Sequence, residues 1–392
     1  MKTEAIRQFN KLANEKFSTD PRQRAWLEID VNSVVSNTKK IKKFIGKDCE
    51  LMAVVKADGY GHGSFTISQA ALEGGATHLG VATLQEGLDL RSQGIFAPIL
   101  ILGNLTAIND LSICLSNNLM PTLSGIREAL ICQNLAKSCD KVFKIHLKVD
   151  TGMTRLGCDF NHSLELCSKI LNLKNIDLSG VYSHLAMADS LLSDYQSTKD
   201  QKSKFDYLVK NLKNKSKSIH FHLANSAGTL RDKSFHYDMV RVGLALYGLN
   251  PLKDCTLDFC FNQSMSIKAK VSLIRNVGKE VGVGYGHTFK TKRESRLAVI
   301  GIGYADGVSR CLSGKIKALH NNIFIPQVGT IGMDQLVLDV TDSPQVKVGS
   351  TVILLGSSGE ESIGIREWSD LANSIPWEIM CSFRDRLPRV VM

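Results

Sequence analysis

The sequence lacks several features that would assign it to a specialised class of protein. No apolar run approaches the roughly 18 residues of a membrane-spanning helix, so we expect no membrane partner. The opening segment, MKTEAIRQFNKLANEKF, has no apolar core of a secretory signal, which predicts a cytoplasmic location. The ten cysteines form no CxxC pair and no regular framework, so we expect reduced thiols and no metal site.

Aromatic residues are also scarce, at 7% of the chain, and this bears on the net charge of +10. A basic surface can bind nucleic acid, but single strands are typically held by aromatic side chains that stack on the bases. The lysines instead gather in 39–47 and 210–217, which are typical of solvated helix faces. We therefore expect no nucleic-acid partner, while the charge favours anionic small molecules.

The most extensive pattern in the sequence is an alternation of short apolar runs with helical periodicity. Such alternation predicts parallel βαβ units, and eight runs indicate a (β/α)8 barrel of the TIM type in an α/β fold. The expected strands are Met52–Val55, Leu79–Ala82, Ile99–Leu102, Met120–Leu123, Val142–Val149, Leu178–Ser183, Ile219–Leu223 and Met239–Tyr247. The expected helices are Ser64–Glu73, Leu84–Gln93, Ala107–Ser116, Gly125–Lys137, His162–Leu171 and Asp194–Leu212. The link between the last two strands is too short to predict a good helix.

The pattern changes after about residue 262, where short apolar runs are separated by turn signals. Helical periodicity is scarce before residues 365–374, which predicts a mainly-β second domain. Its expected strands are Ser266–Ile274, Leu297–Ile302, Ile323–Val328, Gln335–Val340 and Thr351–Leu354. We therefore divide the chain into an N-terminal extension (1–24), a barrel (25–262) and a mainly-β C-terminal domain (263–392).

Lys56 is the residue that points most directly to chemistry. It ends the apolar run 51–55 and precedes the glycine-containing segment 57–63. A lysine at the end of a buried strand is partly desolvated, which favours a neutral amine, and glycines let the backbone approach a ligand. These are the requirements of Schiff-base chemistry. In isolation, a lysine that merely reaches solvent from a strand end would have the same sequence context.

Other polar residues also fall at the carboxyl ends of the expected strands, where barrel enzymes hold their catalytic groups. Segment 225–228, Asn-Ser-Ala-Gly, could hold a phosphate through main-chain N–H groups and a serine hydroxyl. The other polar residues at or near these strand ends are Lys148, Asp150, Arg155, His184, His222 and Arg241.

The run AVVKADGYGHG around Lys56 resembles the cofactor-lysine motif of the alanine racemases, fold-type-III enzymes that use pyridoxal phosphate (PLP). Further runs resemble later blocks of that family in the same order: KVDTGMTRLG, SHLAMAD, ANSAG, VRVGLALYG, VGYGHTF, GYADG and IGMDQL. This ordered succession is highly specific and extends over nearly the whole chain after about residue 24. The resemblance implies a racemase that interconverts L- and D-alanine, with D-alanine serving the bacterial cell wall.

The resemblance implies roles for residues of the barrel. Lys56 would bind PLP as a Schiff base and act as the acid–base group on one face of the substrate. Arg241 would keep the pyridine nitrogen unprotonated, because arginine retains its own proton, and would thereby restrain side reactions. Lys148 is a candidate for carbamylation, which would make it an anion that orients Arg155. The other implied contacts are Tyr60, Ser226, Gly243 and Leu244 at the phosphate, Arg155 at the phenolate oxygen and the substrate carboxylate, and His184 beside Arg241.

The resemblance also implies that the second domain completes the active site of another subunit. Tyr285 would be the acid–base group on the opposite face of the substrate, and Met333 would contact the substrate. A homodimer with two shared active sites follows from this arrangement. Asp189, Tyr304 and Arg310 match residues that line the access corridor.

Two positions depart from the family pattern and bear on substrate choice. Asp385 replaces a tyrosine that many members carry beside the phosphate, and Thr330 stands where many carry an arginine. A carboxylate near a phosphate is repelled unless a cation such as Arg384, Arg386 or Arg310 neutralises it. We therefore expect alanine as the main substrate and serine as a side activity, with a racemase of serine or of broader specificity as the alternative.

Three other interpretations remain open. A PLP-binding homeostasis protein without racemase activity would share the barrel but would lack the second domain. A decarboxylase of the same fold would need a pocket for a basic side chain and typically a cysteine opposite the lysine. A metal-dependent barrel hydrolase is suggested by His220 and His222, which alternate on one side of a strand, although clear carboxylate partners are missing.

Overall fold

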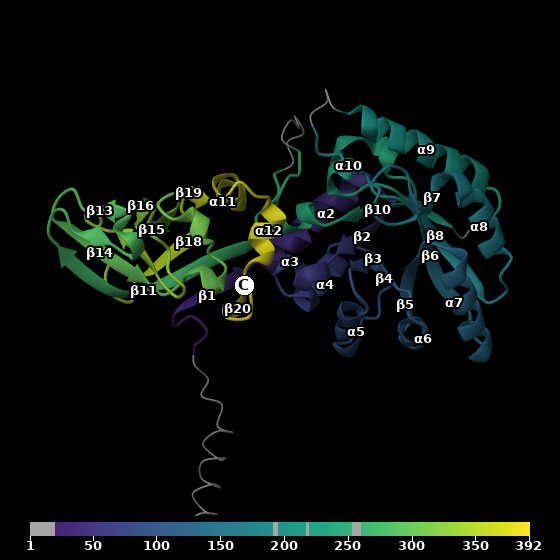
Figure 1. Ribbon diagram of the computed structural model, residues 1–392, viewed down its shortest axis with the longest axis horizontal. Coiled ribbons are helices and arrows are strands. Elements are labelled where there is room, and N and C mark those ends of the chain that lie inside the picture. The colour runs from purple at the N-terminus through teal and green to yellow at the C-terminus, as the bar shows by residue number, and fades with distance from the viewer. Residues whose placement is uncertain (1–19, 191–194, 217–218, 253–259) are drawn as a thin grey trace, which may run out of the picture. The chain divides into compact units, whose positions relative to one another are not determined.

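The structure is a computed structural model that describes residues 20–190, 195–216, 219–252 and 260–392. It divides into two compact units, shown in Figure 1. The barrel unit comprises Ile29–Met265 with Val391–Met392, and the second unit comprises the described residues up to Glu28 together with Ser266–Val390. Most of the predicted N-terminal extension lies outside the described residues.

The barrel unit contains eight parallel strands in a nearly closed barrel, as predicted. Their order is β10-β2-β3-β4-β5-β6-β8-β9, with neighbours hydrogen-bonded, and the short β7 pairs with β6. Between β9 and β10, the N–H groups of Asp238 and Arg241 donate to the carbonyls of Phe221 and Ala224 at 3.0 and 2.9 Å. The strands are β2 (Glu50–Val54), β3 (His78–Val81), β4 (Ile99–Asn104), β5 (Leu119–Leu123), β6 (Phe143–Asp150), β7 (Cys158–Asp159), β8 (Ile176–Tyr182), β9 (His220–His222) and β10 (Met239–Val242).

Helices connect these strands, and the six predicted helices are confirmed to within a few residues. The helices are α2 (Val31–Ile45), α3 (Lys56–Tyr60), α4 (Ser64–Glu73), α5 (Leu84–Ser92), α6 (Ile108–Ser116), α7 (Ile126–Ser138), α8 (Ser163–Leu171), α9 (Gln196–Leu212) and α10 (Ser226–Arg231). The predicted start of α9 at residue 194 lies outside the described residues. Within the described part of the chain, no helix is long and apolar enough to cross a membrane.

The last βα unit differs from the prediction in two ways. The link between the last two strands does contain a helix, α10, which is short. The eighth strand ends at Val242 rather than continuing to residue 247, because the backbone leaves the extended conformation at Gly243 (φ −118°, ψ −85°) and enters a 3-10 helix. This early end brings Gly243 to the carboxyl end of the barrel.

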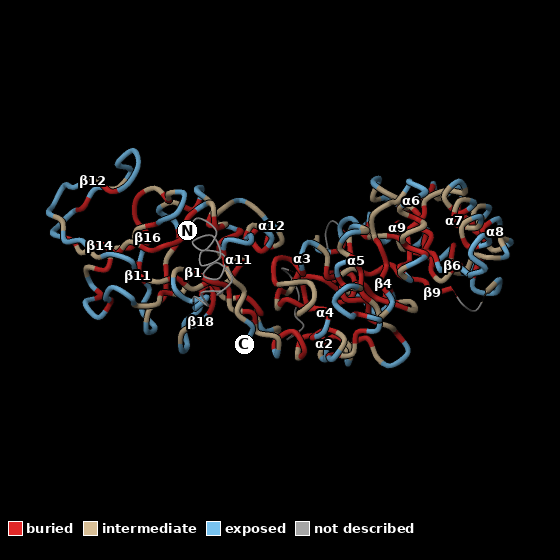
Figure 2. Tube along the Cα trace, turned by 90° about the horizontal axis from the view of Figure 1, so that it is seen from below, coloured by how far each residue is buried: buried red, intermediate tan, exposed pale blue. Residues whose placement is uncertain are grey.

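Alternation along each strand divides the barrel side chains between its interior and the covering helices. The strands of the barrel are largely buried, as Figure 2 shows for β4, β6 and β9. An apolar cluster is formed by Met52, Leu100, Met120, Tyr182 and Met239, which come from five different strands. On β6, by contrast, the alternating positions 144, 146 and 148 carry polar side chains.

The second unit is mainly β, as predicted. Its nine-stranded sheet has the order β19-β18-β15-β16-β17-β14-β11-β1-β20, and β18 also pairs with β11, which closes six of the strands into a barrel. These strands are β1 (Ala25–Ile29), β11 (Met265–Val277), β14 (Ser295–Ile300), β15 (Lys317–His320), β16 (Ile323–Val328), β17 (Leu336–Asp339), β18 (Thr351–Ser358), β19 (Glu361–Ile363) and β20 (Arg389–Val391). Strands β12 (Gly282–Val283) and β13 (Phe289–Lys290) form a separate hairpin, and the helices are α11 (Ile365–Leu371) and α12 (Pro376–Cys381).

Strand β1 departs from the predicted division of the chain, in which the barrel begins at residue 25. It lies between β11 and β20 in the sheet of the second unit. Glu28 on this strand forms an ion pair with Lys268 of β11 at 2.6 Å. The alternating apolar pattern of residues 25–29 marks a strand but carries no information about which sheet the strand joins.

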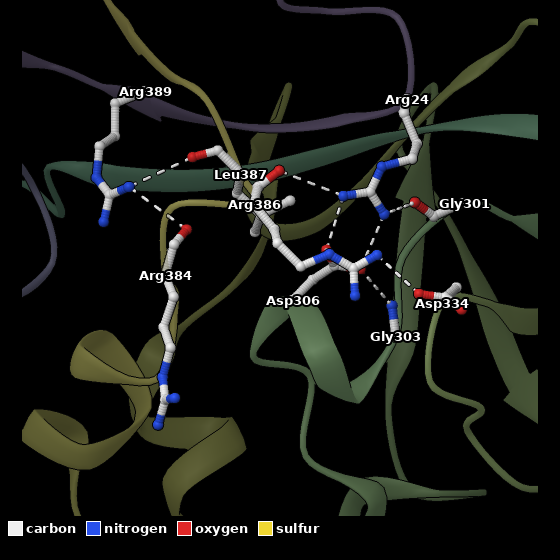
Figure 3. A network of polar contacts seen from close by, with 9 residues as sticks. All are labelled: Arg24, Gly301, Gly303, Asp306, Asp334, Arg384, Arg386, Leu387 and Arg389. Carbon is white, nitrogen blue, oxygen red and sulfur yellow. Dashed lines mark hydrogen bonds and ion pairs between the residues drawn. The ribbon is translucent and has the colours of Figure 1, made fainter.

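A buried carboxylate holds the segment before β1 within the second unit. Asp306 is fully buried and accepts hydrogen bonds from both Nη atoms of Arg24 at 2.7 and 2.9 Å (Figure 3). The N–H of Gly303 donates to the same carboxylate at 3.0 Å, and Nε of Arg386 lies 3.4 Å from it. Arg386 also donates to Asp334 at 2.7 Å. The network therefore joins segments that are far apart in the sequence.

Replacing this carboxylate should destabilise the protein. We expect Asp306→Ala to lower the free energy of unfolding by about 2 kcal/mol, because Arg24, Arg386 and the N–H of Gly303 all lose a buried carboxylate as their partner. The control Asp342→Ala removes a pair with Arg293 whose side chains are 80% and 58% exposed, and should leave the free energy of unfolding almost unchanged. Urea unfolding of both variants measures the difference. Equal losses would contradict the stabilising role of the buried network.

Candidate active site at the barrel mouth

Lys56 lies directly after β2, at the carboxyl end of the barrel, and is half-buried. The chain then passes through a left-handed turn, with φ of 52°, 53°, 60° and 52° at Ala57, Asp58, Gly59 and Tyr60. Left-handed backbone costs roughly 1–2 kcal/mol for each residue other than glycine, and such strain concentrates at functional sites. The strained turn therefore makes the segment after Lys56 a candidate functional segment.

Two carboxylates accept hydrogen bonds that hold the strained turn. Glu86, in the first turn of α5, accepts the main-chain N–H of Ala57 at 2.7 Å. Asp58 accepts the N–H of Ser64 at 2.8 Å. These bonds offset part of the backbone strain and hold the chain on the C-terminal side of Lys56 in one conformation.

Tyr60, at the end of this turn, lies against Gly243 and near Ser226. A Cβ atom added to Gly243 would lie 2.5 Å from the phenol oxygen of Tyr60, so a larger residue would displace the tyrosine. The Oγ of Ser226 accepts the N–H of Gly243 at 3.0 Å. The structure thus brings together three residues that we predicted to contact a phosphate, with Leu244 next in the chain.

Arg241 of β10 is buried and held by carbonyl groups at the ends of the neighbouring strands. Its Nη2 donates to the carbonyls of Ser183 at 2.6 Å and Leu223 at 3.1 Å, and its Nη1 donates to that of His222 at 2.9 Å. Burial lowers the pKa of Arg241 to about 10, which leaves it protonated at neutral pH. It is therefore a fixed hydrogen-bond donor.

Three histidines extend the hydrogen-bond network of Arg241. Nδ1 of His184 lies 3.3 Å from its Nη2, and Nδ1 of His222 lies 2.9 Å from its Nη1. Nε2 of His222 is 3.0 Å from Nδ1 of His146. Burial, reinforced by the charge of Arg241, holds the pKa of His184 and His222 well below the usual range, and burial lowers the pKa of His146 to about 3. All three imidazoles are therefore neutral at physiological pH.

The hydrogen bonds of His222 leave neither of its ring nitrogens free for a metal. Within residues 20–190, 195–216, 219–252 and 260–392, no group of His, Cys, Asp and Glu side chains is arranged to hold a metal ion. Of the two histidines in the pattern His220-Phe221-His222, His222 therefore forms a hydrogen-bonded pair with His146 within the barrel.

Four cationic side chains converge on the barrel mouth: Lys56, Lys148, Arg155 and Arg241. Burial and then the charges of Arg241, Arg155 and Lys56 lower the pKa of Lys148 to about 8, with Asp150 opposing them. Buried positive charge is unfavourable unless an anion compensates it. The donor set therefore fits an anionic small molecule that carries several acceptor oxygens.

Two of the predicted residues of this unit, Arg155 and Asp189, are exposed at the same end of the barrel. Arg155 follows β6, and Asp189 follows β8. Their exposure leaves both side chains accessible to a ligand approaching from solvent.

The remaining predicted site residues belong to the second unit, where several of them lie close together. Tyr285 is 73% exposed and Met333 is 53% exposed. The hydroxyl of Thr330 donates to the carbonyl of Tyr285 at 2.9 Å, and the N–H of Tyr304 donates to the carbonyl of Gly332 at 3.0 Å. The structure therefore gathers Tyr285, Thr330, Met333 and Tyr304 on neighbouring segments of this unit.

A cavity of about 500 Å³ in the second unit includes Tyr304, Arg310 and Arg384 in its lining. Two of these residues were predicted to line the access corridor. Asp385 is fully exposed, and its ion-pair partner is Arg389 at 4.0 Å. Of the cations that we considered for neutralising Asp385, Arg386 is paired instead with the network around Asp306.

Sequence reasoning missed three residues that shape the barrel mouth. The ring of Tyr182 lies 5.0 Å from the guanidinium carbon of Arg241 and 5.3 Å from Nζ of Lys148. His146 pairs with His222. Its alternation with Lys148 along β6 could have predicted that both side chains lie on the same face of the strand. Glu86 belongs to a capping box with Thr83, whose T-x-x-E spacing was also available in the sequence.

Fold and site together define a TIM-type barrel protein with a cluster of lysine and arginine side chains at its strand ends and a β-barrel second domain. Residues 29–251 match the family described as "Alanine racemase, N-terminal domain", and residues 264–391 match "Alanine racemase, C-terminal domain". The chain belongs to the alanine racemase family, as the order of its sequence blocks predicted.

Individual relatives cover nearly the whole chain. It is 56% identical over 375 residues to the alanine racemase of Prochlorococcus marinus, with 95% of this chain and 97% of the relative covered. It is also similar to the structure of alanine racemase from Bacillus anthracis with bound L-Ala-P (34% identity, TM-score 0.85, coverage 94% and 95%). A further similar structure is alanine racemase from Bartonella henselae with covalently bound pyridoxal phosphate (29% identity, TM-score 0.83, coverage 94% and 99%).

Proposed function

We propose that the protein is a PLP-dependent alanine racemase that interconverts L- and D-alanine by moving protons on both faces of the substrate. The observation that carries this proposal is the 56% identity to a curated alanine racemase across both units. The convergence of Lys56 with three other cations at the barrel mouth supports it independently, because it suits an anionic cofactor and an amino-acid carboxylate.

The residues at the barrel mouth fit PLP. Lys56 would form the covalent link to it, and Arg241 would face its ring nitrogen. Tyr60, Ser226, Gly243 and Leu244 would hold its phosphate, and Arg155 would contact its phenolate oxygen and the substrate carboxylate. When bound, PLP would supply an electron sink for the negative charge that develops at Cα of the substrate.

The residues of the chain itself would handle the protons. One of Lys56 and Tyr285 removes the Cα proton from its face, and the other returns a proton to the opposite face, so that the configuration inverts. Arg241 has only donor groups and remains charged, so it would not protonate the ring nitrogen and would restrain side reactions. The neutral His184 accepts from Arg241 and would extend the hydrogen-bond network toward the substrate.

We infer that the site is completed in a homodimer. Tyr285 and Met333 expose large side chains in their own unit, which supports a role in covering the barrel mouth of a second subunit. Each of two active sites would then take Lys56 from one subunit and Tyr285 from the other.

The direct test is to measure interconversion of L- and D-alanine, and separately of the two serine enantiomers, on protein loaded with PLP. We expect alanine to be preferred, with serine as a slower substrate. A strong preference for serine would overturn alanine as the main substrate. Stable PLP binding without any racemisation would instead support a homeostasis protein.

The buried amine of Lys148 should react with carbon dioxide. We expect its nitrogen to attack the carbon, lose a proton and form a carbamate, whose negative charge is favoured beside Arg155 and Arg241. Because the pKa of Lys148 is lowered to about 8, about a tenth of the amine is neutral at pH 7, and the neutral fraction increases toward pH 9. The carbamate signal from ¹³C-labelled bicarbonate, measured by NMR, should therefore increase over that range.

Two variants test the assignment of that signal. Lys148→Ala should remove it, whereas Lys169→Ala, which changes a lysine with a 58% exposed side chain, should leave it unchanged. A signal that persists in Lys148→Ala, or that is absent from the unsubstituted protein at pH 9, would refute the modification.

A further inference from the structure

A cavity of about 510 Å³ lies at the amino ends of the barrel strands, the opposite end from Lys56. Its volume falls within the roughly 300–1,000 Å³ typical of small-molecule sites. TIM barrels usually fill their interior with branched apolar side chains, but this cavity is lined by His78, Lys144, Asp177 and His220. Lys56, Lys148, Arg155 and Arg241 of the barrel mouth do not line this cavity, so the chemistry proposed there does not explain its polar groups.

His146 presents a hydrogen-bond donor to this cavity. Arginine has only donor groups, so Nδ1 of His222 must accept from Arg241, and the proton of neutral His222 is then on Nε2. That proton is donated to Nδ1 of His146, so neutral His146 carries its own proton on Nε2. Within the described chain this Nε2 has no hydrogen-bond partner, although the residue is only 1% exposed and lines the cavity.

Two opposite charges border the cavity and are unpaired within the part of the chain that the structure describes. Lys144 of β6 and Asp177 of β8 are register neighbours on adjacent strands, and both line the cavity. Among the described residues neither side chain forms a hydrogen bond or an ion pair. A second cationic residue, Arg91, also lines the cavity, but its guanidinium donates to four main-chain carbonyls.

Apolar side chains complete the lining, and two of them, Phe96 and Val142, are exposed. Phe96 is 90% exposed and Val142 is 60% exposed, and both border the cavity together with Leu119 and Met120. Exposed apolar side chains rimmed by polar residues are typical of a ligand-binding site. The cavity therefore offers donors, one acceptor carboxylate and an apolar wall.

We propose that this cavity binds a free amino acid with a bulky apolar side chain, at a site separate from the active site. The ligand carboxylate accepts from Nε2 of His146 and from the ammonium of Lys144. The ligand ammonium pairs with Asp177, and the side chain packs against Phe96 and Val142. Positions 144 and 146 lie about 7 Å apart along one face of β6, a span that a carboxylate between their side chains can bridge.

Titration of the holoenzyme with 4-fluoro-L-phenylalanine, followed by ¹⁹F NMR, tests the site directly and independently of catalysis. We expect saturable binding that Lys144→Ala weakens by about tenfold, since a hydrogen bond to a charged group is lost. Lys141→Ala, at an exposed lysine that does not line the cavity, is the matched control and should leave binding unchanged. Ser179→Phe places an aromatic ring in the cavity and should abolish binding.

A second probe tests the amino group. Asp177→Asn should weaken the binding of 4-fluoro-L-phenylalanine by about tenfold. It should not weaken the binding of 3-(4-fluorophenyl)propionate, which lacks the ammonium. No saturable binding to the unsubstituted protein, or binding that survives Ser179→Phe, would overturn the site. Equal effects of Asp177→Asn on both probes would overturn the amino-acid assignment. Racemase activity of the Lys144→Ala protein should be unchanged, which separates this result from the proposed function.

Discussion

Replacing Lys56 with alanine should reduce kcat/KM for alanine racemisation by at least about 10⁴-fold in both directions, because one residue supplies both the covalent link and one of the two proton-transfer groups. The loss should be equal for L- and D-alanine, since either direction needs a proton at the Lys56 face. Chiral chromatography of reaction mixtures that start from each enantiomer measures both rates.

The fold should survive this substitution, because Lys56 is only half-buried and the adjacent turn is held by Glu86 and Asp58. Lys47→Ala, at an exposed lysine before β2, is the matched control and should retain full activity. The purified protein should also lose the absorbance at about 420 nm that is expected of a lysine-bound PLP. Substantial racemisation by the Lys56→Ala protein would refute the assignment of its amine to proton transfer.

Tyr285→Phe should reduce racemisation by about 10³-fold, since it removes only the hydroxyl that would move the proton on the second face. The substitution should abolish inversion of the substrate but not all exchange of its Cα proton. Exchange of the Cα proton with deuterium from solvent should continue for the enantiomer whose proton faces Lys56, while inversion to the other enantiomer is lost. Proton NMR in deuterium oxide follows exchange and inversion in the same sample.

A merely structural role for Tyr285 would lower exchange of both enantiomers together, and that outcome would contradict the assignment. The side chain is 73% exposed in its own unit, so removal of its hydroxyl should not affect folding. Tyr207→Phe, at a tyrosine that is 53% exposed on α9, is the control and should leave both exchange and inversion unchanged.

The shared site can be tested by mixing the two inactive variants. In a mixed dimer, one site would contain Lys56 from the Tyr285→Phe subunit and Tyr285 from the Lys56→Ala subunit. Random reassociation would make half of the dimers mixed with one intact site each, so about a quarter of the activity should return. Failure of reassociated mixtures to recover activity would show that each site draws both residues from a single subunit.

The local sequence pattern was sufficient to predict most helices and strands of the barrel. The family motifs were sufficient to identify the candidate site residues. The eight strands and six of the helices could be placed because apolar periodicity is a short-range property of the chain. Lys56 was recognisable from its position between a buried strand and a glycine-containing turn. The same reasoning could not place β1, because an alternating five-residue segment fits the edge of many sheets.

The sequence by itself therefore determined the family, the barrel and the identity of the residues at the strand ends, because these follow from motifs and local periodicity. Only the tertiary structure decided that four cations converge, that Lys148 is buried enough to lower its pKa to about 8, and that His146 reaches Arg241 through His222. It also decided that polar groups line a cavity at the other end of the barrel. Burial and charge–charge distance depend on how strands far apart in sequence close into a barrel, and no window of sequence contains that information.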